Sequence, residues 1–98
     1  MYRTPIHPGR HLAEELMELA MTPTELARRL DVPANRITQI INGTREVTAD
    51  TALRLAHFFG TTAAFWLNLQ ALYDLRVAEQ KTGTAIRALP TLKHAVHA

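Results

Sequence analysis

Proline and glycine residues divide this sequence into short segments that carry apolar side chains at helical spacing. A proline inside a helix disrupts its hydrogen bonding, and a glycine readily adopts the left-handed conformation that ends a helix. Between these breaks, leucine, isoleucine and alanine recur at intervals of three and four residues, the period of a helix with one apolar face. The pattern predicts an all-α fold. We predict five helices, near residues 9–20, 23–30, 34–42, 49–59 and 63–81.

Capping residues support these boundaries. Thr22 precedes a helix that begins with proline, and Glu25 follows three positions later, which is a capping-box pattern. Gly43 is suited to end the third helix in a left-handed conformation. Thr48 and Thr62 stand at the N-terminal caps of the last two predicted helices.

The chain has 98 residues, which is enough for one small domain. A domain of this size buries only about 60–65% of its unfolded surface, so a second subunit that covers apolar area would stabilise it. We expect residues 1–81 to form the domain, including a long last helix that dimerises. That helix should stop before Gly83, and residues 82–98 should form a tail whose order the sequence leaves open, because Pro90 interrupts its apolar residues.

Composition excludes several classes of protein. Cysteine is absent, which rules out disulfides, cysteine nucleophiles and thiolate metal sites. No apolar run approaches the roughly 20 residues that cross a bilayer, and the N-terminus lacks the apolar core of a signal peptide. We therefore expect a soluble cytoplasmic protein without membrane contact. The net charge is only +2, so overall charge does not by itself indicate a nucleic-acid partner.

The second and third predicted helices, with a tight turn between them, have the arrangement of a helix-turn-helix. Ala27 stands where two such helices approach closely, and a larger side chain there would push them apart. Opposite its isoleucines, the third helix presents small and amide-bearing side chains that should face outward. The residues spaced to fill the core between the two helices are Leu26, Leu30, Val32, Ile37 and Ile40.

The outward side chains have the chemistry that reads a DNA major groove. An asparagine or glutamine amide can bind an adenine edge with a paired donor and acceptor, and Arg36 can reach guanine or a phosphate. Thr38 can donate a hydrogen bond or contact a thymine methyl group, and hydroxyl groups at the start of the second helix favour phosphate. The predicted DNA-binding residues are Thr22, Thr24, Arg28, Ala34, Asn35, Arg36, Thr38, Gln39, Asn42, Thr44 and Arg45.

A solvated face in a protein that never contacts DNA is the alternative interpretation of the same pattern. Residues 22–45 hold four arginines and two acidic residues, a net charge of +2. Binding to DNA without sequence preference should therefore be modest, and much of the affinity should come from dimer contacts and base readout.

The last predicted helix has more apolar surface than one contact requires. Most of its aromatic residues and leucines fall on one broad face, whereas Leu67 and Leu75 project elsewhere. We expect a homodimer, which would hold two recognition helices about 34 Å apart, one turn of DNA. Alternatively, the tail covers Leu67 and Leu75, or these two side chains are exposed to solvent. Trp66 could form a platform for a ligand, but an aromatic residue in such a helix is more typical of a core. The predicted dimerisation residues are Phe65, Trp66, Leu67, Leu69, Leu72, Tyr73 and Leu75.

Histidines raise the question of a metal site. His7 and His11 are four apart, and His94 and His97 three apart, spacings that can bind zinc on a helix. A Pro-Gly pair interrupts the first pair, however, and neither pair has a cysteine or spaced carboxylate to complete it. We predict no metal and no cofactor. Without paired catalytic carboxylates or a phosphate-binding glycine pattern, we also predict that the chain is not an enzyme; a hydrolase that uses these histidines is the alternative.

Longer stretches of the sequence resemble the Xre/lambda-repressor-like helix-turn-helix proteins and, within them, the HigA-type antitoxins. The resemblance covers about residues 5–78. Its specific parts are an Asn-Gly-x-Arg stretch, a Thr-Ala-Asp-Thr-Ala stretch and a Phe-Trp-Leu-Asn-Leu-Gln stretch in this order, which begin at Asn42, Thr48 and Phe65.

The resemblance implies a five-helix homodimer that binds a small basic ribonuclease toxin of the HigB type and neutralises it. It also implies that the dimer binds a palindromic double-stranded operator and represses its own operon. By resemblance, Thr24 and Arg45 would touch the DNA backbone. A stand-alone Xre-type repressor without a toxin partner is the alternative. The residues that would read the operator are Asn35, Arg36, Thr38, Gln39 and Asn42.

Three features depart from the family pattern. Asp31 stands where these turns usually carry glycine, although aspartate tolerates the left-handed region better than most residues. Arg10 replaces an acidic residue after Pro-Gly and loses a favourable charge near a helix N-terminus. The mildly basic chain also argues against simple electrostatic attraction to a basic toxin.

Overall fold

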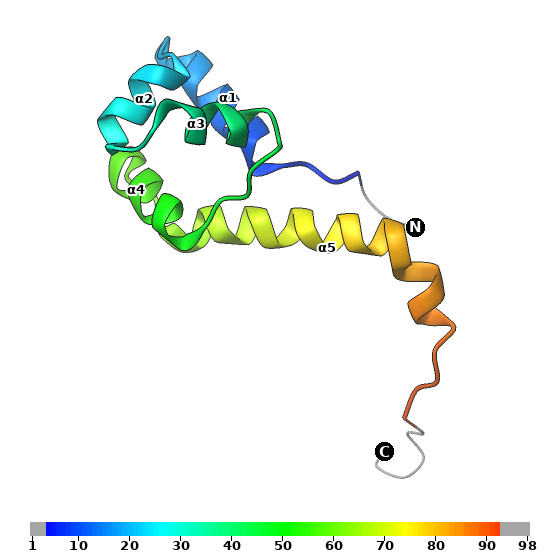
Figure 1. The fold of residues 1–98 in the computed structure, drawn as a ribbon. Helices are drawn as coiled ribbons and strands as arrows, with labels where there is room; N and C mark the ends of the chain where they lie inside the picture. The colour runs from blue at the N-terminus through cyan, green and yellow to red at the C-terminus, as the bar shows by residue number, and fades with distance from the viewer. Residues whose placement is uncertain (1–3, 93–98) are drawn as a thin grey trace.

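A computed structural model describes residues 4–92 of the chain, and these residues contain helices but no strand. Figure 1 shows the first four helices gathered into a globular part, while the fifth passes along it and extends away. The predicted all-α class and the number of helices are confirmed. The elements are α1 (Pro8–Leu19), α2 (Pro23–Leu30), α3 (Ala34–Ile41), α4 (Ala49–Phe59) and α5 (Ala63–Arg87).

The core joins one face of each of the first four helices to the beginning of α5. The side chains predicted to lie between α2 and α3 are buried, and Val32 packs against them from the turn. Trp66 carries the core into α5 and donates from its indole nitrogen to the Thr61 hydroxyl over 3.0 Å. The buried cluster consists of Leu12, Leu16, Leu26, Ala27, Leu30, Ile37, Ile40, Val47, Ala52, Leu55, Ala56 and Trp66.

Both tight turns around α3 use the backbone conformation that the sequence predicts. Asp31 has φ of 58° at the end of α2, so an aspartate does occupy the left-handed region there. Gly43 has φ of +80° directly after α3. Thr22 accepts a hydrogen bond from the Glu25 amide, which confirms the predicted cap of α2. These turns fix the direction in which α3 leaves its neighbours.

His7 forms the N-terminal cap of α1 and has no counterpart in the sequence predictions. Its Nδ1 accepts a hydrogen bond from the Gly9 amide over 2.9 Å, which requires that nitrogen to be unprotonated. No group of three potential metal-binding side chains occurs within residues 4–92, and His94 and His97 lie outside the described residues.

Gly9 allows α1 to rest directly on the backbone of α3. A Cβ atom placed on Gly9 would lie only 1.8 Å from the carbonyl oxygen of Ile40 and 2.9 Å from the Cα atom of Ile41. Because both atoms belong to the backbone, a side-chain rotation cannot relieve this overlap. The position of α3 therefore depends on the absence of a side chain at residue 9.

Helix α5 is longer than the sequence predicted, because it ends at Arg87 and not near Lys81. The expected division between residues 81 and 82 falls inside a helix. Gly83 lowers helix stability by about 1 kcal/mol relative to alanine, but its neighbours continue the hydrogen-bonded turns. Pro90 is the effective stop, since it disfavours helical backbone in the residue before it. Across residues 4–92, no helix is both long and apolar enough to span a membrane.

The contact at Gly9 predicts a large penalty for a small substitution. Gly9→Ala should lower the free energy of unfolding by about 1–3 kcal/mol, because the added methyl group forces α1 and α3 apart. Chemical denaturation followed by circular dichroism measures this change. Arg10→Ala is the matched control, since its exposed side chain should contribute less than about 0.5 kcal/mol. Equal stabilities of the two variants would contradict the close contact.

Candidate nucleic-acid interface

Helix α3 separates its apolar and polar side chains onto opposite faces. Ile37 and Ile40 are fully buried in the core. Ala34, Asn35 and Asn42 are exposed, and Asn42 is the C-terminal cap of the helix. The isoleucines point inward and the amide side chains outward, as the sequence predicted. Helix α3 therefore offers an uncharged polar surface to a partner outside the monomer.

Gln39 and Arg45 form one unit on this surface. The Arg45 Nε donates a hydrogen bond to the Gln39 Oε1 over 2.8 Å, across the turn that follows α3. The Thr44 hydroxyl also donates to the backbone carbonyl of Gln39, over 3.2 Å. The arginine fixes which end of the glutamine amide faces it. The amide NH₂ group and the second lone pair of the oxygen are left for a nucleic-acid base.

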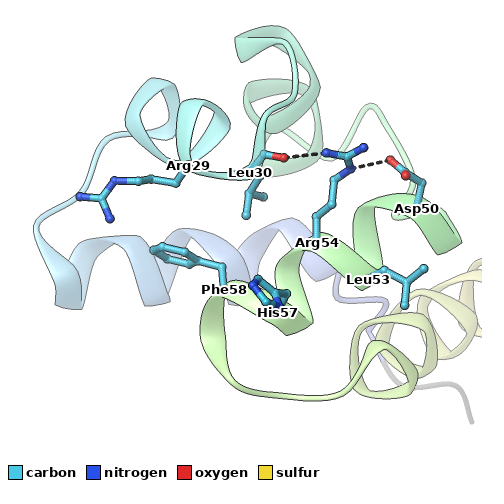
Figure 2. A pocket seen from close by; sticks show the side chains of 7 residues that line it. All are labelled: Arg29, Leu30, Asp50, Leu53, Arg54, His57 and Phe58. Carbon is cyan, nitrogen blue, oxygen red and sulfur yellow. Dashed lines mark hydrogen bonds and ion pairs between the residues drawn. The ribbon is translucent and has the colours of Figure 1, made fainter.

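Arg36 is part of a brace between helices. Its guanidinium bonds Asp50 Oδ2 at 3.0 Å, and the Arg54 Nε bonds the same oxygen at 3.0 Å. Arg54 also donates to the Leu30 carbonyl over 2.8 Å, so it satisfies the end of α2 (Figure 2). Arg36 therefore differs from the expected free base-reading side chain, because it links α3 to α4.

The pKa of Asp50 is lowered from its ordinary value, first by the hydrogen bond from Arg54 and the positive charge of Arg54, and then by the Arg36 guanidinium. Asp50 and Arg54 were not among the predicted site residues, although their spacing of four on one helix is visible in the sequence. Sequence spacing alone does not show that Arg54 reaches the end of α2, which lies 24 residues earlier.

The hollow drawn in Figure 2 lies between α2 and α4 and has a volume of about 350 Å³. Apolar side chains from α4, namely Leu53 and Phe58, line it together with Arg29 and His57. Its carboxylate, Asp50, is already held by two arginines. The hollow therefore shows no pair of carboxylates in general acid–base geometry.

The predicted phosphate-contacting residues of α2 lie around a hollow of about 290 Å³, formed by Thr22, Thr24, Glu25 and Arg28. The Thr22 hydroxyl oxygen is occupied as the helix cap. The Glu25 carboxylate lies 3.9 Å from Arg28 and 3.4 Å from Arg29, and both pairs are exposed. The structure thus brings the predicted residues together, but it places an acidic group among them.

The Thr38 hydroxyl is engaged within its own helix. It donates to the backbone carbonyls of Asn35 and Ala34 over 3.2 and 3.4 Å. Its role as a base contact remains a prediction. The residues of α3 whose side chains are most available to a partner are Ala34, Asn35 and Asn42, with Gln39 half-buried beside them.

The loop between α3 and α4 is held by side chains to which the sequence analysis did not assign this role. Gln70 of α5 is only 6% exposed and accepts a hydrogen bond from the Val47 amide over 2.8 Å. On the other side of the loop, the His7 ring lies beside the Arg45 backbone and makes an edge-on contact with the Tyr73 ring at 4.9 Å. An amide side chain among the apolar residues of the predicted last helix is the one sequence signal that could have pointed to Gln70.

The apolar residues predicted for dimerisation fall into three groups according to their exposure. Phe65, Leu72 and Leu75 are 37%, 44% and 61% exposed and form an uncovered part of α5. Trp66 is only 1% exposed, which confirms the core interpretation and makes its place among the dimerisation residues wrong. Its side chain is buried inside the monomer and cannot contact a second chain. Three further members of the predicted set are half-buried: Leu67, Leu69 and Tyr73.

Several known proteins are similar to this chain. The helix-turn-helix family model matches residues 12–66. An addiction module antidote protein of the HigA family from Coxiella burnetii is 54% identical, with a TM-score of 0.90 over 93% of this chain and 100% of that one. The antitoxin HigA of Pseudomonas aeruginosa, in a structure with the higBA promoter, is 41% identical, with a TM-score of 0.88 over 92% of this chain and 100% of that one. Virulence-associated protein I of Dichelobacter nodosus is 47% identical over 76 residues, which are 76% of this chain and 70% of that protein.

The cap formed by His7 predicts a pH dependence of stability. Burial lowers the pKa of His7, against smaller opposing effects of the Arg45 backbone and the Asp74 charge. Because the folded state disfavours the protonated ring, the contribution of His7 is present above about pH 6.5, its unfolded pKa, and is lost as the pH falls through the lower folded pKa.

His7→Asn provides the comparison, since asparagine keeps an acceptor for the helix cap and does not titrate. The free energy of unfolding of the unaltered chain should exceed that of the variant at pH 7.5, and this difference should shrink toward pH 5. Urea denaturation across that range measures it, and the other histidines cancel in the comparison. A difference that stays constant with pH would show that His7 is not the titrating group.

Proposed function

Because the chain belongs to the helix-turn-helix family and, within it, to the HigA-type antitoxins, we propose that it is an antitoxin that represses transcription by binding operator DNA. The observation that carries this proposal is the outward polar face of α3, with the Gln39–Arg45 pair at its end. The Pseudomonas aeruginosa relative, whose structure includes the higBA promoter, supports the same role for this chain.

In this proposal α3 enters the major groove and reads base edges. Asn35 and Asn42 are exposed amides, and Gln39 lies between them with its orientation set by Arg45. Arg36 holds the helix against α4 and contributes through the position of α3. Thr24, Arg28 and the charged end of Arg45 supply contacts to phosphates, which fix the register of the protein on the duplex.

A homodimer completes the DNA-binding unit. The uncovered apolar residues of α5, foremost Phe65, Leu72 and Leu75, are the surface that we assign to the second copy. Two recognition helices in fixed register require half-sites separated by one helical turn of DNA or a multiple of it. A palindromic operator follows from the twofold symmetry of such a dimer.

The second part of the proposed function is neutralisation of a small ribonuclease toxin. The names of the relatives, an addiction module antidote and an antitoxin, support it. A stand-alone repressor without a toxin is the second candidate. The net charge of +2 favours the stand-alone repressor, because a basic toxin would not be attracted to this chain by overall charge.

Gln39→Ala is the direct test of base reading. Binding to a duplex that the wild-type chain selects from a random-sequence library should weaken by about 1–3 kcal/mol, while binding to mixed-sequence duplex should weaken less. Fluorescence anisotropy at fixed salt measures both affinities. The physical reason is that removal of the amide deletes a base contact and also releases Arg45.

Gln80→Ala is the matched control. It removes the same kind of side-chain amide from an exposed position of α5, remote from α3 in the sequence, and should leave both affinities unchanged. Equal losses on the selected and mixed duplexes in Gln39→Ala would mean that Gln39 does not read bases. A wild-type chain that selects no duplex from the library would overturn the DNA-binding proposal itself.

Purification from the native host distinguishes the antitoxin from the stand-alone repressor. A tagged copy of the chain should retain a small basic protein after nuclease digestion, because the complex is held by protein contacts and not by shared DNA. Mass spectrometry identifies the bound protein. An RNA cleavage assay should then show that the chain inhibits it at equimolar ratio. If the chain elutes alone, or if the bound protein cleaves RNA equally with and without the chain, the stand-alone repressor is the correct hypothesis.

A further inference from the structure

We propose that Gln70 is a positioning residue for DNA binding: it fastens the loop between α3 and α4 to α5 and so places Arg45 beside the recognition helix. The inference rests on the proposed function, since it assigns Gln70 a role in the DNA contacts of Arg45. No contact between Gln70 and DNA is implied, because its side chain is buried.

Both ends of the Gln70 amide are engaged. Its Oε1 accepts a hydrogen bond from the Val47 amide over 2.8 Å, and its Nε2 donates to the Asp74 Oδ1 over 3.0 Å. Gln70 is 6% exposed and Val47 is 2% exposed. The bond to Val47 joins residues 23 positions apart, and Asp74 lies one turn further along α5. Asp74 therefore fixes the orientation of the amide that receives the loop.

The chemistry of position 70 is narrowly defined. An apolar side chain would leave the buried Val47 amide without a partner, which costs more than an average hydrogen bond gains. A glutamate would keep the acceptor for Val47 but would place two carboxylates against each other at Asp74. Glutamine supplies one acceptor and one donor at the same time, in the arrangement that the two neighbours require.

The same loop is held from its other side by His7. The His7 ring lies beside the Arg45 backbone, caps α1 through Gly9, and packs edge-on against Tyr73 of α5. The loop runs from α3 toward α5 (Figure 1). The backbone at residues 45 and 47 is thus tied to α1 and α5.

Arg45 carries this constraint to the recognition helix. Its side chain is exposed, and its Nε bonds the Gln39 Oε1 at 2.8 Å. Two hydrogen bonds therefore link Asp74 and Gln70 to Val47, the loop backbone leads from Val47 to Arg45, and a third hydrogen bond links Arg45 to Gln39. If the loop is released at Val47, the backbone of Arg45 is no longer held in the position from which its side chain reaches both Gln39 and a phosphate.

The salt dependence of DNA binding tests this inference. Affinities for the duplex selected by the wild-type chain are measured between 50 and 200 mM salt for the wild type, Gln70→Met, Arg45→Ala and the double variant. The slope of log affinity against log salt is negative, and each lost phosphate contact reduces its magnitude by about 0.9. Gln70→Met and Arg45→Ala should each lower it by that amount for every protomer engaged. The double variant should match Arg45→Ala alone, because Gln70 acts through Arg45.

Instability of Gln70→Met gives a different result. A smaller folded fraction lowers the apparent affinity equally at every salt concentration and leaves the slope unchanged. Circular dichroism sets an assay temperature at which the variants are folded. A Gln70→Met slope equal to that of the wild type, or slope losses that add in the double variant, would overturn the inference. Failure of the wild type to bind any selected duplex would instead overturn the proposed function.

A charge-balanced exchange provides an independent check. Gln70→Glu should weaken binding by about tenfold, because a buried group is left facing a like charge. The double variant Gln70→Glu with Asp74→Asn restores one donor and one acceptor and keeps the net charge of the wild type, so its affinity and slope should return. Asn68→Asp adds the same charge as Gln70→Glu at an exposed position of α5 and measures the electrostatic effect alone. A double variant as weak as Gln70→Glu would contradict the inference.

Discussion

The burial of Ile37 and Ile40 is the interaction on which the rest of the structure depends. Both side chains are fully enclosed, so the rotation of α3 about its axis is fixed by the largest favourable contribution available to it, the burial of apolar surface. The outward direction of Asn35, Gln39 and Asn42 follows from the helical period and requires no contact of their own. A polar recognition surface can therefore exist without stabilising the fold.

The position of α3 along and across the domain depends on backbone contacts. Gly9 lets α1 lie against the carbonyl of Ile40, and Asp31 makes the turn that leads into the helix. These contacts tolerate very little displacement, since backbone atoms cannot change rotamer to make room. The domain thus combines a recognition helix held by backbone contacts with polar side chains on its outer face.

Polar contacts in this protein differ in strength according to their burial. The pairs that Glu25 and Asp50 make with arginines are exposed, and such pairs contribute at most about 1 kcal/mol each. The hydrogen bond between Gln70 and Val47 is buried, so its loss would leave an unsatisfied amide in the interior. The surface pairs orient side chains near the recognition helix. The buried amide determines where the loop after that helix runs.

Much of this architecture follows from the sequence alone. The helical period and the capping residues predicted the number of helices and the inward face of α3, because these depend on residues within four positions of each other. The left-handed turn at Asp31 was expected from the family resemblance, because glycine usually stands there and aspartate tolerates that region. The end of α5 was not, since Gly83 is a weak stop signal in a helix whose neighbours favour continuation.

The tertiary structure decided which side chains remain available for partners. It placed Trp66 in the core, and it engaged Arg36 with Asp50 over a separation of 14 residues. It also joined Gln70 to a loop 23 residues away. Contacts of this kind depend on how helices pack, and apolar periodicity specifies the face of a helix but not the partner that each polar atom meets. Sequence therefore determined the helices and their faces, and packing determined the hydrogen bonds that support the recognition surface.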